Sequence, residues 1–140
     1  MATFNKFRAF VEAVGQKKLN LNADQLNVLL TDTSPVNTNS VYADISGTEL
    51  ANGNGYLTGG KQVTNNTYTQ TAGVGKLVGD DVTWTATGSM GPFRYVVLYD
   101  FTATNKDLIG WWDRGTSVTL VAPDTFTSDF DQTAGILTIT

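Results

Sequence analysis

Hydrophobic residues recur with a helical period at one place in this chain, close to its start. Four apolar residues there occupy positions i, i+3, i+4 and i+7 and share one stripe of an α-helix: Phe7, Phe10, Val11 and Val14. We expect one helix over residues 3–14, with Thr3 as its N-cap and Gly15 as its C-terminal stop. Because isolated helices of this length are marginal in water, this one must pack on another part of the chain.

From residue 25 onward, apolar and polar residues alternate with the period of two that is typical of β-strands. A first strand is predicted over 25–31, and a turn-rich stretch with many Asn and Gly residues separates it from the rest. From residue 61 onward the strands follow at the spacing of a β-sandwich or barrel, over 62–71, 74–79, 81–87, 93–101, 107–113, 116–121, 125–131 and 135–140. Turn residues separate two of these pairs, at 88–92 and 114–115.

These elements predict an all-β protein, a jelly-roll-like β-sandwich with one short N-terminal helix. A chain of 140 residues can bury its own core, so residues 1–140 are expected to form a single domain. The helical segment 1–18 is expected to pack on or beside the sandwich. The strand predicted over 93–101 has apolar residues on both faces, which indicates a central position in its sheet.

The composition excludes several kinds of chemistry. The chain has no His and no Cys, so it cannot form a Ser-His-Asp or Cys-His triad and offers zinc no imidazole or thiolate. It has 22 Thr, a β-branched residue that favours strands. No apolar stretch reaches the roughly 18–20 residues that span a bilayer, and no signal-peptide pattern opens the chain. We therefore expect a structural or binding protein with no enzymatic activity, no cofactor and no membrane partner.

Charge is distributed unevenly along the chain. The first 18 residues carry Lys6, Arg8, Lys17 and Lys18 against a single glutamate, a net charge of +3, whereas the remaining residues have a net charge of −7. The overall net charge of −4 argues against nucleic acid as a partner. The basic segment is either a solvated helix face or a surface that binds an acidic protein.

Two pairs of aspartates are candidate sites for acid–base catalysis or for calcium binding. Asp80 and Asp81 follow a glycine and are typical of a turn. Asp129 and Asp131 share one face of a predicted strand, on either side of the apolar Phe130. A solvated strand face is the simpler interpretation, and no metal site is predicted.

Trp111 and Trp112 are neighbours in a predicted strand, so one faces the core and the other faces outward. An outward Trp marks a surface for a protein or a sugar, unless the second sheet and the N-terminal helix cover both sides of the strand. The candidate partner-binding residues are Lys6, Arg8, Lys17, Lys18, Trp112 and Arg114.

Four strings of residues are similar to those of a known protein family. They are Thr3-Phe4-Asn5-Lys6-Phe7 with Phe10-Val11-Glu12, Gly91-Pro92-Phe93-Arg94-Tyr95-Val96-Val97-Leu98-Tyr99, Leu108-Ile109-Gly110-Trp111-Trp112-Asp113, and Phe126-Thr127-Ser128-Asp129-Phe130-Asp131-Gln132. With them the chain resembles, nearly from end to end, the capsid cement (decoration) proteins of tailed phages, including short-tailed phages of Bordetella. The strings are packing and turn motifs, so they indicate a family and not a chemical site.

The resemblance implies a jelly-roll protein on the outer surface of the virion, assembled in the host cytoplasm. It implies that the protein clamps neighbouring subunits of the major capsid protein, forms a homodimer near two-fold positions and has no catalytic residues. Two alternatives stay open. The chain could be a tail or baseplate component, or a carbohydrate-binding module that uses Trp84 or Trp112 as a flat platform.

Overall fold

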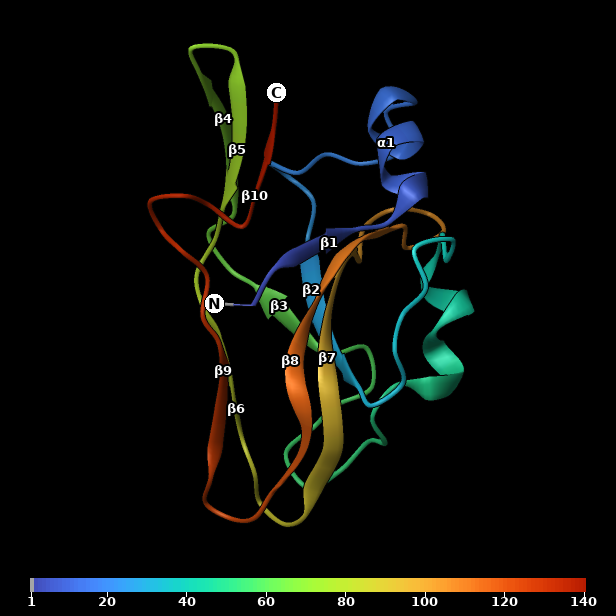
Figure 1. Cartoon of the computed structure of the whole chain (residues 1–140), viewed down its shortest axis with the longest axis vertical. Coiled ribbons are helices and arrows are strands. Elements are labelled where there is room, and N and C mark those ends of the chain that lie inside the picture. The colour runs from blue at the N-terminus through green and yellow to red at the C-terminus, as the bar shows by residue number, and fades with distance from the viewer. Residues whose placement is uncertain (1) are drawn as a thin grey trace.

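The computed structural model describes residues 2–140, and its largest element is a five-stranded antiparallel sheet (Figure 1). The strand order is β1-β8-β7-β2-β3, formed by Phe4–Lys6, Leu108–Leu120, Met90–Asp100, Leu26–Thr31 and Lys61–Val63. Strand β7 is the middle strand, as the apolar residues on both of its faces predicted.

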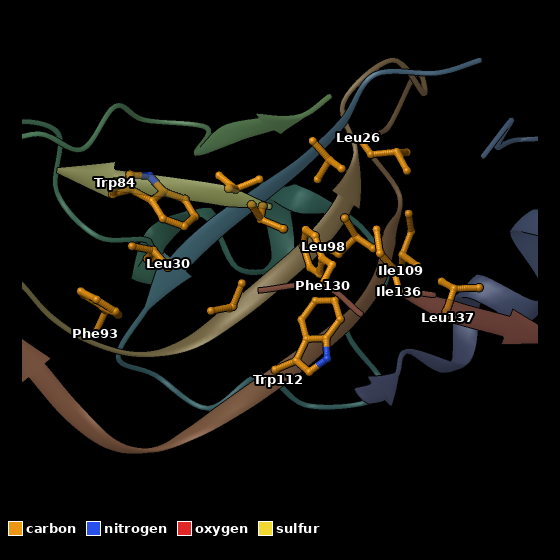
Figure 2. Packing of buried hydrophobic residues seen from close by; sticks show 14 of the residues in the cluster. Leu26, Leu30, Trp84, Phe93, Leu98, Ile109, Trp112, Phe130, Ile136 and Leu137 are labelled. Atoms are coloured by element: carbon orange, nitrogen blue, oxygen red, sulfur yellow. The ribbon is translucent and has the colours of Figure 1, made fainter. Parts of the chain in front are cut away.

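Two smaller antiparallel sheets lie along one side of the large sheet (Figure 1). One has the order β10-β5-β4, formed by Leu137–Ile139, Val74–Val78 and Thr67–Thr71. The other pairs β6 with β9, which are Val82–Thr85 and Thr125–Ser128. Buried side chains from all three sheets, including Leu30, Trp84, Phe93, Trp112 and Leu137, form the main core between them (Figure 2). The prediction of an all-β sandwich with one short helix is confirmed, and its second layer is divided into two sheets.

The other face of the large sheet carries a second, smaller core. Leu29, Val97 and Tyr99 project from its strands, and Ile45 covers them from the segment of two short 3₁₀ helices, η1 (Tyr42–Asp44) and η2 (Ser46–Thr48). Glu49 fastens this segment, because its carboxylate accepts hydrogen bonds from the hydroxyl groups of two tyrosines and from a backbone amide: Tyr42, Tyr56 and Gly59. These hydrogen bonds hold the segment of the two 3₁₀ helices against the second face of the large sheet. Both faces of the large sheet are therefore covered.

The N-terminal segment differs from the prediction in one respect. Residues 4–6 form strand β1, and helix α1 is Arg8–Gly15. Thr3 is therefore not the N-cap. Phe7 occupies that position in an extended conformation and makes no side-chain cap. The reason is burial: Phe7 is fully buried in the second core, and the apolar area removed from water outweighs the hydrogen bond of a Thr cap.

Three predicted strand boundaries are also wrong. Strands β3 and β4 replace the single strand predicted over 62–71, because Asn65 adopts a left-handed conformation with φ 54°. Strand β7 begins at Met90, inside the predicted turn at 88–92. Strand β8 runs through the predicted break at 114–115, although its pairing with β7 is interrupted there by a bulge opposite Arg94.

Candidate partner-binding site

The four basic residues of the N-terminal segment all lie at or next to α1. Lys6 ends β1, Arg8 begins the helix, and Lys17 and Lys18 follow its last turn. All four side chains are exposed. Within residues 2–140 the one ion pair is Arg94–Asp113, so none of the four cations has an acidic partner in the described part of the chain.

The predicted apolar stripe of α1 is only half buried. Phe10 lies in the main core, together with Ala13 on the same side of the helix. Val11 and Val14 are 58% and 38% exposed. The helix packs on the sandwich as predicted, but with only part of its apolar stripe, and two valines remain on the surface near the cations.

These valines border a groove between the helix and the last strand. A hollow of about 330 Å³ is lined by Phe4 and Lys6 of β1, Val11 and Val14 of α1, and the chain end at 137–140. A second hollow of about 580 Å³ is lined by both lysines that follow the helix. Val14 and Ile139 line both hollows, so the two are adjacent. We call this surface the α1–β10 groove.

Asp24 lines the larger hollow and lies beside Asp100, which is not part of the lining. Asp100 is fully buried, its Oδ1 accepts hydrogen bonds of 3.0 Å from the backbone amides of Thr102 and Ala103, and its Oδ2 has no protein donor. Burial and a hydrogen bond with the neighbouring Asp24 raise the pKa of Asp100 to about 7. Burial therefore favours the protonated form of Asp100. Asp24 also accepts a 2.9 Å hydrogen bond from the amide of Asn20, so its carboxyl is engaged within the chain.

The two neighbouring tryptophans lie on opposite faces of β8, and both faces are covered. Trp112 is 6% exposed and lies in the main core beside Phe130 (Figure 2). Its ring is also 5.3 Å from that of Phe4. Trp111 is half-buried, with its ring 4.6 Å from Phe7. The prediction that Trp112 contributes to an outward partner surface is wrong, because β1 and the 126–130 segment close over it. Trp84 is 2% exposed, so neither Trp84 nor Trp112 presents a flat platform to a sugar.

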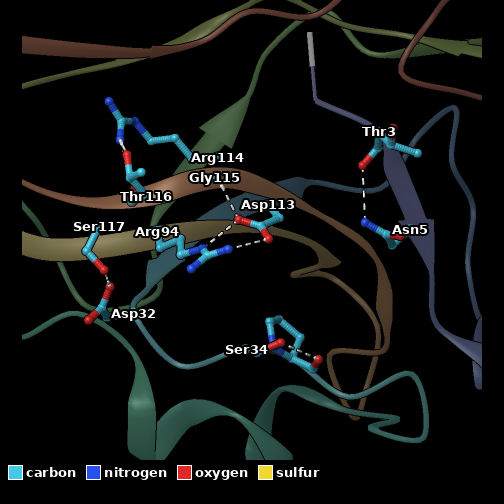
Figure 3. Close-up of polar contacts among 11 residues, drawn as sticks. Thr3, Asn5, Asp32, Ser34, Arg94, Asp113, Arg114, Gly115, Thr116 and Ser117 are labelled. Atoms are coloured by element: carbon cyan, nitrogen blue, oxygen red, sulfur yellow. Dashed lines mark hydrogen bonds and ion pairs between the residues drawn. The ribbon is translucent and has the colours of Figure 1, made fainter.

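Arg114 lies in the exposed bulge of β8 (Figure 3). Its guanidinium donates to the carbonyl oxygen of Thr116 at 2.8 Å. The adjacent Asp113 accepts two hydrogen bonds from Arg94, at 2.8 and 3.0 Å, which fix the bulge. Arg114 and the edge of Trp112 line a separate hollow of about 270 Å³ that shares no lining residue with the α1–β10 groove. The structure therefore does not bring these two candidates together with the basic segment.

The paired aspartates lie in the connections between strands. Strand β9 ends at Ser128, so Asp129 and Asp131 do not share a strand face as predicted. Asp131 accepts the backbone amides of the next turn at 2.8 and 2.7 Å, and these bonds lower its pKa. Asp81 accepts the amide of Phe130 at 2.8 Å. In the described part of the chain, no three acidic side chains are grouped to hold a metal ion.

Sequence reasoning missed the α1–β10 groove. The apolar period of α1 was visible, but it could not show that Ala13 replaces Val11 and Val14 on the buried side.

No helix within residues 2–140 is long and apolar enough to cross a membrane. No protein-family model, curated protein or solved structure matches this chain.

Proposed function

We propose that this chain is a structural virion protein that decorates the outside of a tailed-phage capsid and clamps neighbouring major capsid subunits. The observation that carries the proposal is the surface of α1, where four unpaired cations surround two exposed valines. An apolar patch bordered by charge is typical of a protein interface. The resemblance of the sequence to capsid cement proteins supports the same function.

The fold suits a protein that resists mechanical load. Helix α1 is anchored by the buried rings of Phe7 and Phe10, so a partner bound to it pulls on the core of the sandwich. Packed DNA pushes capsid subunits apart, and a protein bound across their seam opposes this force through many copies of a moderate interface. The cations would mainly accelerate association and make it salt-dependent, because exposed ion pairs contribute little affinity.

We also propose that the protein forms a homodimer through β4. This strand is an edge of its sheet, and four of its five residues are exposed. It contains no charged residue and no proline, and it pairs with β5 without a bulge. An edge without charge, proline or bulge is suited to pairing with another strand, and such pairing would displace the 2.9 Å bond that the amide of Tyr68 donates to Asn22. Antiparallel pairing of two identical strands is compatible with two-fold symmetry.

Copy number in purified virions tests the capsid assignment. A protein that decorates the shell is expected in hundreds of copies per particle, whereas a tail or baseplate component is expected in a few to tens. Quantitative mass spectrometry against the major capsid protein measures this ratio. A ratio typical of tail components would replace the capsid assignment with the tail or baseplate alternative.

A further inference from the structure

We infer that the α1–β10 groove binds an extended, acidic segment of a partner protein, and that this segment adds to the free edge of β10. The inference rests on the proposed function and deepens it, because it names the chemistry of the capsid segment that is recognised. Three independent features of the groove support it: its apolar surface, its strand edge and its charge.

The apolar surface lacks a cover. Val11 and Val14 are the exposed half of a helix face whose other half is buried in the core. Across the groove, Ile139 is half-buried and lines both hollows together with Val14. The hollows have volumes within the range of about 300–1,000 Å³ that is usual for ligand sites. A side chain placed between the helix and β10 would remove these apolar groups from water.

The strand edge specifies an extended partner. Strand β10 pairs with β5 on one side, where Leu137 is opposite Leu77 and Ile139 is opposite Gly75. Its other edge has no strand partner within residues 2–140. Backbone groups on such an edge can pair with an added strand, whose alternate side chains then point into the groove.

The charge specifies an acidic partner. Lys6 lines the smaller hollow, and Lys17 and Lys18 line the larger one, so cations lie at both ends of the groove. The one acidic side chain in the lining, Asp24, is already hydrogen-bonded to Asp100 and to the amide of Asn20. An occupant with carboxylates on either side of an apolar residue therefore complements the groove.

Binding of short synthetic peptides tests the occupant directly. The probe is a blocked seven-residue peptide in which Val alternates with Glu, Asp and Thr, titrated into the ¹⁵N-labelled protein. Two matched peptides are compared with it: one has Lys in place of each acidic residue, and one has Pro at alternate positions, which removes amide donors. We expect amide shifts confined to the residues that line the groove, with the largest over 10–18 and 137–140, and binding at least about tenfold weaker for each matched peptide.

Substitutions in the groove provide the second arm. Val11→Asp combined with Val14→Asp is expected to weaken binding of the acidic peptide at least about tenfold. Val36→Asp is the matched control, because Val36 is 55% exposed and lies outside the groove, and it is expected to bind like the parent. If the double Asp variant fails to fold, Val11→Ser with Val14→Ser replaces it, with thermal unfolding as the check.

Several outcomes would overturn the inference. They are no binding of the acidic peptide at millimolar concentration, equal binding of the Lys or Pro peptide, and shifts located outside the groove. Concentration-dependent shifts of the same residues without peptide would assign the groove to a second copy of the chain instead.

Capsid binding separates the inference from the proposed function. If the protein decorates empty shells and the double Val variant decorates them as tightly as the parent, the inference is wrong and the function stands. If the peptide binds in the groove but the protein does not decorate shells, the function is wrong and the recognition of acidic strands stands.

Discussion

Lys17 adopts a left-handed backbone conformation, with φ 60°, directly after helix α1. Its amide donates to the carbonyl of Val14 at 3.2 Å, and the amide of Lys18 donates to that of Ala13 at 2.9 Å. This is the hydrogen-bond pattern of the Schellman motif, in which Gly usually occupies the left-handed position. The motif ends the helix and places the two lysines at the groove. At Lys17 the left-handed backbone costs free energy because the residue has a Cβ, whereas its positive charge is favourable at the C-terminal end of the helix.

Lys17→Gly is therefore expected to raise the free energy of unfolding by about 0.5–1 kcal/mol, because Gly adopts this conformation without a Cβ penalty. Urea denaturation measures the change. Lys17→Ala is the matched control: it removes the same charge and keeps the Cβ, so it is expected to give no gain. An equal gain for both variants would show that the charge, and not the backbone, governs this position.

Asp100 makes stability depend on pH in an unusual direction. Its pKa is raised to about 7, so the folded protein favours the protonated carboxyl. The stabilisation is fully present below the ordinary pKa near 4 and is lost as the pH rises through about 7, with a slope of up to about 1.4 kcal/mol per pH unit. We expect the free energy of unfolding to fall between pH 5 and pH 7.5 for the parent protein.

The variant Asp100→Asn isolates this contribution. Its amide oxygen still accepts the two backbone hydrogen bonds and its amide nitrogen donates to Asp24, so the loop geometry is preserved at all pH values. The difference between the parent and the variant, measured by urea denaturation at several pH values, should change steadily between about pH 4 and pH 7 and level off above about pH 7. A constant difference from pH 5 to pH 8 would mean that Asp100 stays ionised in the folded state.

At the scale of elements, the sequence predicted the kinds of structure better than their ends. Alternation located most strands because every second side chain faces the core, as in β6, where buried and exposed residues alternate. Thr3 was wrongly assigned as the N-cap, because the segment after it pairs with β8, a contact with residues far along the chain. Val11 and Val14 fit the helical period, but which side of α1 is buried depends on the sandwich beneath it.

The exposed edge of β4 leads to a prediction about self-association. Thr69 is the middle residue of the strand, so in a two-fold antiparallel pair it lies opposite or next to its own copy. Thr69→Lys should therefore weaken a β4 dimer at least about tenfold, since like charges across paired strands repel. Sedimentation equilibrium measures the dissociation constant, with the exposed Thr116→Lys in the β8 bulge as the control. Equal dimer stability in both variants, or a monomeric parent at high micromolar concentration, would contradict the proposed dimer.

At the scale of the whole molecule, the structure is a sandwich with both faces of its main sheet covered and an uncovered apolar surface at α1. The sequence alone shows that His and Cys are absent and that charge is distributed unevenly along the chain. The groove could not, because it is formed by β1, α1 and β10, which come from opposite ends of the chain. The burial of Trp112 could not be predicted from the sequence either, because β1 and Phe130 contact it only in the folded protein.

The central claim is that the basic surface at α1 attaches the protein to a capsid, and one measurement tests it most directly. Lys6, Arg8, Lys17 and Lys18 are all changed to Glu, and decoration of empty shells is titrated at low and high salt, with circular dichroism confirming the fold. The proposal predicts weaker attachment at low salt and a flatter salt dependence than the parent shows. If the quadruple variant decorates shells as tightly as the parent at low salt, the segment is only a solvated face and the proposed attachment surface is wrong.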